Sequence, residues 1–185
     1  MLKPRSTVIA LIAVICAFYL WELLDAGIIN TLALVNIEYL RASNEWYRLF
    51  TVALLHDTSS SIPIHLAFNM MAIHSLGSPI ESLLGRTRFL IIFFISLLTG
   101  SLTSAFSLGW NGYSIGASGA VFGLFGAFIA LGRRLGSEIK GIVIIVVINF
   151  ALGFTIGGVD WRAHLGGLVG GLLITKALLV FNAAK

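Results

Sequence analysis

Long apolar runs follow one another along the chain, with short polar breaks between them. Each run is close to the roughly 20 residues that cross about 30 Å of hydrocarbon as a helix. The apolar residues are continuous rather than alternating, which favours membrane helices over the strands of a barrel. The pattern predicts an all-α integral membrane protein, a single domain over residues 1–185 with six spanning helices at residues 6–24, 63–84, 89–108, 116–132, 140–157 and 161–181.

The composition supports this interpretation. Apolar residues make up 58% of the 185 residues and charged residues only 11%, whereas a soluble domain carries about 25% charged residues. The mean hydropathy is +0.98. These values exclude a soluble enzyme and a disordered chain, and the net charge of +4 is too small for a surface that follows nucleic-acid phosphates. We therefore expect the lipid bilayer as a partner and no nucleic acid.

The first apolar run has a second possible interpretation, a secretory signal peptide. Its apolar part, residues 8–21, is long for a signal peptide, and Glu22 and Asp25 follow it with no clear small-residue cleavage site. These features favour a membrane helix.

The distribution of Lys and Arg predicts the orientation, because cytoplasmic loops carry an excess of both. With the N-terminus in the cytoplasm, nine of the twelve Lys and Arg residues lie on the cytoplasmic side, and only Arg41, Arg48 and Arg162 lie outside. An even number of spans then returns the C-terminus to the cytoplasm. The long outer loop at residues 25–62 contains Trp46, Tyr47 and Phe50, which is typical of a segment at the membrane interface.

Polar residues inside membrane helices are costly, so each one needs a partner or a role. Ser118 lies fifteen residues before Arg133, at the cytoplasmic end of the fourth predicted helix. At 1.5 Å per residue this places Ser118 roughly 22 Å above that end, or roughly 8 Å below the outer surface. Non-helical backbone such as residues 112–116 is tolerated there only inside protein or beside a water-filled cavity.

Three more polar residues lie at a similar predicted depth. His65 and Asn69 are four residues apart in the second helix and share one face. Asn69 lies about 9 Å, and His164 about 5 Å, below the outer ends of their helices. His74 falls on the opposite face from His65, so we expect it to be a packing residue.

Small residues indicate which helices touch, because small stripes let helix backbones approach closely in lipid. One stripe in the fourth helix consists of Gly119, Gly123, Gly126 and Ala130. Gly167 and Gly171 follow His164 on its own face of the sixth helix. If the two stripes meet, Ser118 lies beside His164, an arrangement that suits a nucleophile and its general base.

Other interpretations of these polar residues are open at this point. Serine in a membrane helix often bonds to its own helix, and glycine stripes often serve packing alone. A transporter or proton path would need polar groups on both sides of the midplane, and the inner half of the predicted bundle has few. We expect Asp160 and Arg162 to pair at the interface, and His56 to lie in the outer loop without a chemical role.

Four segments together resemble motifs of the rhomboid intramembrane serine proteases. Residues 45–51 resemble the Trp-Arg motif of the long first loop, and residues 65–69 match a His-x-x-x-Asn motif. Residues 116–119 match Gly-x-Ser-Gly, and residues 163–171 match Ala-His-x-x-Gly-x-x-x-Gly. Each motif alone is weak, whereas all four in this order are specific for the family.

The resemblance implies a six-helix rhomboid-like bundle of the minimal type common in the prokaryotic plasma membrane. It implies a serine endopeptidase with Ser118 as nucleophile and His164 as general base, without a metal or cofactor. His65 and Asn69 would stabilise the oxyanion together with the backbone at Ser118, and Gly116 would belong to this oxyanion and substrate region. The implied substrates are single-pass transmembrane proteins, cut near the outer face.

Two further points concern the family. Phe122 stands where several members carry a tyrosine that stacks on the catalytic histidine, so we expect stacking with less polar contact. Some relatives are inactive scaffolds that lack the serine or the histidine, whereas this chain has both.

Overall fold

The structure is a computed structural model that describes residues 6–60, 62–107, 112–135, 139–155 and 159–183. These residues form helices and loops, and the β-type pairing within them is one isolated antiparallel bridge between Leu34 and Ser114. In chain order the helices are α1 (Ser6–Leu24), α2 (Ile28–Leu32), α3 (Ile37–Ser43), α4 (Arg48–Thr51), η1 (Val52–Leu54), α5 (Ile64–Leu84), α6 (Arg86–Ala105), α7 (Ser118–Leu131), η2 (Gly132–Leu135), α8 (Ile139–Thr155) and α9 (Trp161–Ala183).

The six long helices lie where the apolar runs predict them. Helix α1 has the expected bounds, and α6 begins three residues earlier than expected, at Arg86. The predicted ends at residues 108 and 156–157 fall outside the described residues. Within the described residues, three helices, α1, α6 and α9, are long and apolar enough to cross a membrane by length and composition. The number of six crossings stays a prediction, because α7 and α8 are shorter apolar helices.

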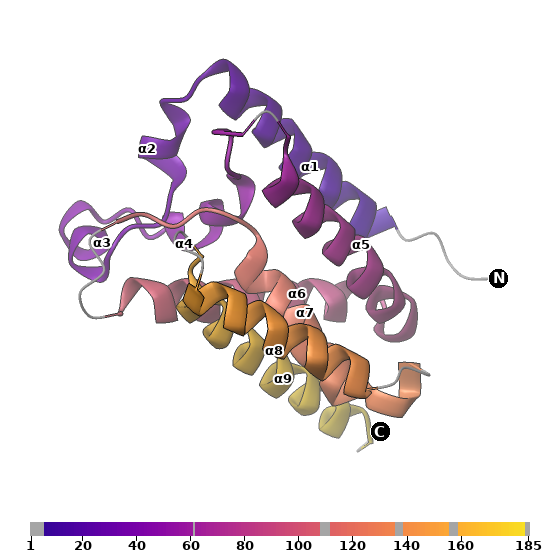
Figure 1. Ribbon diagram of the computed structural model, residues 1–185. Helices are drawn as coiled ribbons and strands as arrows, with labels where there is room; N and C mark the ends of the chain where they lie inside the picture. The colour runs from indigo at the N-terminus through magenta and orange to yellow at the C-terminus, as the bar shows by residue number, and fades with distance from the viewer. Residues whose placement is uncertain (1–5, 61, 108–111, 136–138, 156–158, 184–185) are drawn as a thin grey trace.

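The long loop after α1 is folded around one buried arginine. Arg48 is only 3% exposed. Its guanidinium donates to the carbonyls of Ala33 at 2.8 Å and Asn30 at 2.7 Å, and its Nε donates to the Glu45 carboxylate at 2.5 Å. A buried charge is tolerated when it is paired and fully hydrogen-bonded. Arg48 of α4 thus binds α2 through these carbonyls, and its guanidinium also lies over the ring of Tyr39 on α3. The three short helices lie at the left of Figure 1.

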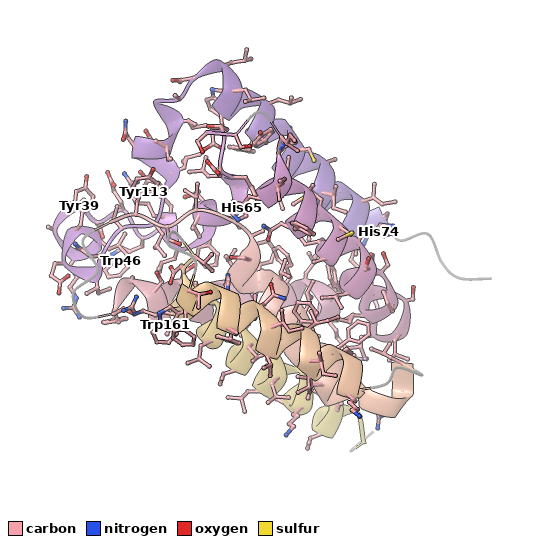
Figure 2. All side chains as sticks on the ribbon, in the orientation of Figure 1. Tyr39, Trp46, His65, His74, Tyr113 and Trp161 are labelled. Carbon is pink, nitrogen blue, oxygen red and sulfur yellow. The ribbon has the colours of Figure 1, made fainter. Side chains whose placement is uncertain are left out.

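Exposed aromatic residues gather at the same end of the molecule as this loop. Figure 2 shows Tyr39, Trp46, Tyr113 and Trp161 there, away from the end at which α1 begins. Tyr39, Trp46 and Tyr113 are exposed. Aromatic rings in this position suit the interface between lipid and water.

Helices α6, α7 and α9 form the tightest part of the bundle, and α7 packs most extensively against α9. A Cβ on Gly167 would collide with the carbonyl of Gly119, and a Cβ on Gly171 would collide with that of Gly123. On the other side of α9, Gly170 leaves room for Thr99 of α6. The two glycine stripes therefore face each other as expected, and they let the backbones touch.

Helix α1 packs beside α5, as Figure 1 shows. Glu81, buried near the end of α5, accepts the backbone N–H groups of Thr7 at 3.2 Å and Val8 at 3.1 Å. The first turn of a helix has no intrahelical partners for its N–H groups. The Glu81 carboxylate supplies an acceptor for two of these N–H groups. It also fixes α1 against α5 at the end of the bundle opposite the folded loop.

Candidate active site

One contact between the polar residues singled out above joins α7 to α9. The Nε2 atom of His164 lies 2.9 Å from the Oγ atom of Ser118. Ser118 is the first residue of α7, and His164 lies one turn into α9. Ser118 is half-buried and His164 is buried. The facing glycines of α7 and α9 set this distance, because bulkier residues there would force the two helices apart.

The His164 ring is held by aromatic contacts as well as by Ser118. The Phe122 ring stacks on it, with ring centroids 4.1 Å apart and planes 8° apart. Phe150 of α8 approaches it edge-on, with centroids 6.5 Å apart. The expected stacking of Phe122 is confirmed. Within the described residues, the Nδ1 atom of His164 has no hydrogen-bond partner, so packing does most to orient the ring.

Asp160 fixes the start of α9 just before His164. Its carboxylate accepts the N–H of Ala163 at 3.2 Å and the hydroxyl of Ser104 at 2.5 Å. The expected pairing of Asp160 with Arg162 is wrong, because the Arg162 guanidinium lies over the ring of Trp161, 4.9 Å from its centroid. Asp160 instead caps α9 and ties it to α6, which fixes the depth of His164.

The backbone before Ser118 is anchored to the folded loop after α1. Leu34 and Ser114 exchange two backbone hydrogen bonds, and the Gly116 N–H donates to the carbonyl of Val52 at 2.9 Å. Gly116 has a φ of +116°. This backbone conformation is strongly unfavourable for residues other than glycine. A Cβ at Gly116 would also lie 2.8 Å from Cε1 and 2.9 Å from Nε2 of His65. Gly116 therefore lets the His65 ring lie directly against the backbone segment that leads to Ser118.

His65 and Asn69 lie in the first two turns of α5, next to this backbone. Asn69 is buried, and its amide donates to the carbonyl of His65 at 2.9 Å. Figure 2 shows His65 at the loop end of α5, with His74 farther along the helix. His74 lies away from His65, as the helical phase predicts, but it is exposed, so the expectation that it packs within the protein is wrong. The structure thus gathers Ser118, His164, Gly116 and His65 around one end of α7, with Asn69 one turn from His65.

His56 lies in the outer loop as expected, but the sequence interpretation did not predict its burial beside His65. It is fully buried, and its ring centroid lies 5.0 Å from that of His65. Its N–H donates to the Glu22 carboxylate of α1 at 3.0 Å. Burial, assisted by nearby His65 and opposed by the carbonyl of Leu54, lowers the pKa of His56 to about 3. The one signal in the sequence is its place directly after the apolar residues 52–55.

The candidate site offers a serine, an imidazole base and several hydrogen-bond donors. Within the part of the chain that the structure describes, no three His, Cys, Asp or Glu side chains are grouped closely enough to hold a metal ion. A hydroxyl 2.9 Å from an imidazole nitrogen is the geometry of a serine nucleophile with its general base. The arrangement can carry out acyl transfer.

Comparison with known proteins identifies the family. The rhomboid domain model matches residues 43–181. The chain is 37% identical over 185 residues to the rhomboid protease GluP of Bacillus subtilis, covering 95% of this chain and 35% of GluP. It is 33% identical over 139 residues to the putative rhomboid protease YdcA of the same organism, covering 72% of this chain and 68% of YdcA.

Similarity extends to eukaryotic proteins. The chain is 31% identical over 156 residues to rhomboid-like protease 3 of Toxoplasma gondii, covering 78% of this chain and 57% of that protein. The chain thus spans about a third of the length of GluP, but most of its own length is matched in each case. With its apolar helices and its rhomboid domain, the protein is an integral membrane protein of the rhomboid family.

Proposed function

We propose that this protein is an intramembrane serine endopeptidase that cleaves transmembrane helices near the outer membrane face. The observation that carries the proposal is the 2.9 Å contact between His164 Nε2 and Ser118 Oγ in a buried site between membrane helices. Relatives named rhomboid proteases support intramembrane protease function. Because the chain covers only 35% of GluP, we infer its activity from the geometry of its own site.

The proposed reaction begins with His164. Its Nε2 accepts the proton of the Ser118 hydroxyl as Oγ attacks the substrate carbonyl carbon, and the carbonyl π electrons move onto oxygen. When the tetrahedral intermediate collapses, the peptide C–N bond breaks and His164 gives its proton to the leaving amine. Water then attacks the acyl carbon while His164 accepts a proton from the water. The bond between this carbon and Ser118 Oγ breaks, and His164 gives the proton to Oγ. This second attack releases the acid and restores the serine.

The oxyanion of the intermediate needs hydrogen-bond donors at the start of α7. The N–H groups of a helix's first turn have no intrahelical acceptors and carry partial positive charge. His65 would donate from Nε2, and Asn69 from the amide hydrogen that is not used by the His65 carbonyl. Oxyanion donors contribute about 3–4 kcal/mol each in well-studied hydrolases. Gly116 contributes through its conformation, since its own N–H is bonded to Val52.

The substrate must unwind before it reaches Ser118. A helix in lipid keeps its carbonyls bonded within the segment, so none is open to attack. Glycine costs a helix about 1 kcal/mol relative to alanine and proline about 3. We therefore infer that single-pass substrates are cut near the outer end of their helix, after a small residue, with Gly or Pro nearby. Leucine in place of these helix breakers should slow cleavage severalfold.

The location in the cell follows from the same proposal. We infer a prokaryotic plasma membrane, a single domain over residues 1–185, and both termini in the cytoplasm. The bias of nine Lys and Arg residues against three supports this orientation. It is also supported by Figure 1, where α1 begins and α9 ends on the side away from α2 to α4.

Purified protein in detergent, mixed with a fluorescent transmembrane substrate, tests the function. Wild type should cleave, whereas Ser118→Ala and His164→Ala should each abolish cleavage without unfolding the bundle. The double variant should be no worse than either single one, because the residues act as a unit. His74→Ala, on the exposed face of α5, is the control and should retain activity. Full cleavage by Ser118→Ala would contradict the proposal.

A further inference from the structure

Two consecutive residues after η1 connect α1 to the His65 ring. The N–H of His56 donates to Oε2 of Glu22, which lies near the end of α1 and is 3% exposed. The next N–H, that of Asp57, donates to Nδ1 of His65 at 3.4 Å. Neighbouring N–H groups of this short segment are therefore bound to two different helices. A shift of the segment at Glu22 would move the group that contacts His65.

The contact from Asp57 determines which His65 nitrogen carries the proton. In a neutral imidazole, one ring nitrogen donates and the other accepts. Since Nδ1 accepts the Asp57 N–H, the hydrogen is on Nε2. The Cε1–Nε2 edge lies against Gly116, two residues before Ser118. His65 therefore presents a donor on the side of the ring that faces the start of α7.

The His56 ring limits how His65 can turn. It lies 5.0 Å from the His65 ring, centroid to centroid, with the planes 53° apart. Neither nitrogen of His56 has a hydrogen-bond partner within the described residues, although the ring is fully buried. Its low pKa keeps it neutral, so it packs beside His65 without repelling it.

We propose that Glu22 and His56 are positioning residues that hold His65 in the Nε2–H form, with its ring fixed against Gly116. Glu22 acts through the backbone of His56 and Asp57, and His56 acts through its ring. Neither side chain touches the substrate. The inference rests on the proposed function, in which His65 donates to the oxyanion. It assigns the tautomer of His65, which belongs to α5, in part to Glu22, which belongs to α1.

Nitrogen-15 NMR of the histidine-labelled 185-residue chain in detergent micelles reads the tautomer directly. The chain has four histidines, and the His65 signals are assigned by their loss in His65→Ala. Wild type should show His65 with a protonated Nε2 and an accepting Nδ1. Glu22→Ala should convert this pattern to a mixture of tautomers. Glu22→Gln keeps an acceptor oxygen at the same place and should restore the wild-type pattern.

Glu81 provides the matched control. It is also a buried carboxylate that accepts backbone N–H groups, but it does so at the other end of α1. Glu81→Ala should lower thermal stability and leave the His65 signals unchanged. A merely structural role for Glu22 would make the two alanine variants behave alike.

Cleavage kinetics give a second readout. Glu22→Ala should lower kcat by about tenfold with KM changed less than about twofold, since a misplaced oxyanion donor acts only in the transition state. His56→Ala should do the same, and His56→Phe should keep more activity because it retains a ring. These two variants test the ring even if Glu22→Ala does not fold.

The outcomes separate the two proposals. A wild-type His65 protonated on Nδ1, or an unchanged tautomer and kcat in Glu22→Ala, would overturn the positioning role while cleavage by Ser118 stands. A wild type that cleaves nothing would overturn the proposed function, and the NMR spectra would still report whether Glu22 sets the tautomer.

Discussion

The ring of Phe122 lies flat on the imidazole of His164, with ring centroids 4.1 Å apart and planes 8° apart. Phe122 is one turn after Ser118 on α7, so one helix supplies both the candidate nucleophile and the support for its base. Because His164 Nδ1 has no hydrogen-bond partner within the described residues, this stack is the main restraint on the ring.

Phe122→Ala should therefore lower kcat strongly while the protein stays folded. Stacked aromatic pairs contribute about 0.5–1.5 kcal/mol beyond burial, and a mobile base would add to the loss. Phe122→Tyr keeps the stack and should retain most of the activity. The measurement is kcat of both variants and of wild type from steady-state cleavage kinetics. Equal activity of Phe122→Ala and wild type would show that the stack does not position the base.

Gly116→Ala tests the close approach of His65. The new Cβ would lie 2.8 Å from the His65 ring, at a φ of +116°. We expect loss of cleavage together with a modest loss of stability, because the ring must move away from the start of α7. The measurement is cleavage rate alongside the thermal unfolding midpoint.

Gly85→Ala is the control for backbone strain. Gly85 also has a positive φ, +85°, but a Cβ there would meet nothing within 4 Å. It should lose stability by about 1–3 kcal/mol from strain and keep its activity. If both variants lost activity equally, strain rather than the His65 contact would explain the Gly116 result.

Much of this arrangement could be predicted from the sequence. Apolar runs place the six long helices, since continuous apolar stretches must be helical in lipid. Helix depth and the facing glycines bring Ser118 to His164, because both follow from a fixed rise per residue and from residue size. Such features depend only on nearby residues and on the regular geometry of a helix, so they can be predicted without knowing the rest of the fold.

The contacts made by the long first loop could not be predicted in the same way. His56 lies in the loop as expected, but its burial against His65 could not be predicted. Asp160 was expected to pair with Arg162, and it binds Ser104 and Ala163. The contacts of His56 with His65, of Asp160 with Ser104 and of Arg48 with Ala33 each join different elements of the fold. No periodic pattern encodes such contacts.

Gly167→Ala should disrupt the packing of α7 on α9. Its Cβ would collide with the carbonyl of Gly119, and overpacking typically costs about 1–3 kcal/mol. We expect a lower unfolding midpoint and lost cleavage, since Ser118 and His164 would separate. Gly141→Ala, on α8 with open space around its Cβ, should stay within about 1 kcal/mol of wild type. Similar behaviour of the two variants would contradict direct backbone contact.

The buried His56 predicts a dependence of stability on acid pH. Its pKa falls from an ordinary 6.5 to about 3 on folding, so below pH 6.5 the unfolded chain binds a proton that the folded chain does not. Stability is therefore lost as the pH falls from 6.5 toward 3, by at most about 1.4 kcal/mol per pH unit from this group.

His56→Phe removes this titration and keeps a ring in place. Comparing unfolding midpoints at pH 7 and pH 4.5 in both proteins cancels the contributions of Glu22, Asp57 and His65, which lie nearby. The variant should lose less stability on acidification than wild type does. An equal loss in the two proteins would mean that His56 is protonated in the folded state.

The central claim is that Ser118, activated by His164, is the nucleophile. Mass spectrometry of the protein after reaction with a fluorophosphonate tests it most directly, because the reagent marks the activated serine by a covalent bond. We predict one adduct, on the peptide that contains Ser118, with strong loss of labelling in His164→Ala and none in Ser118→Ala. An adduct on a different serine, or labelling that persists in Ser118→Ala, would contradict the account.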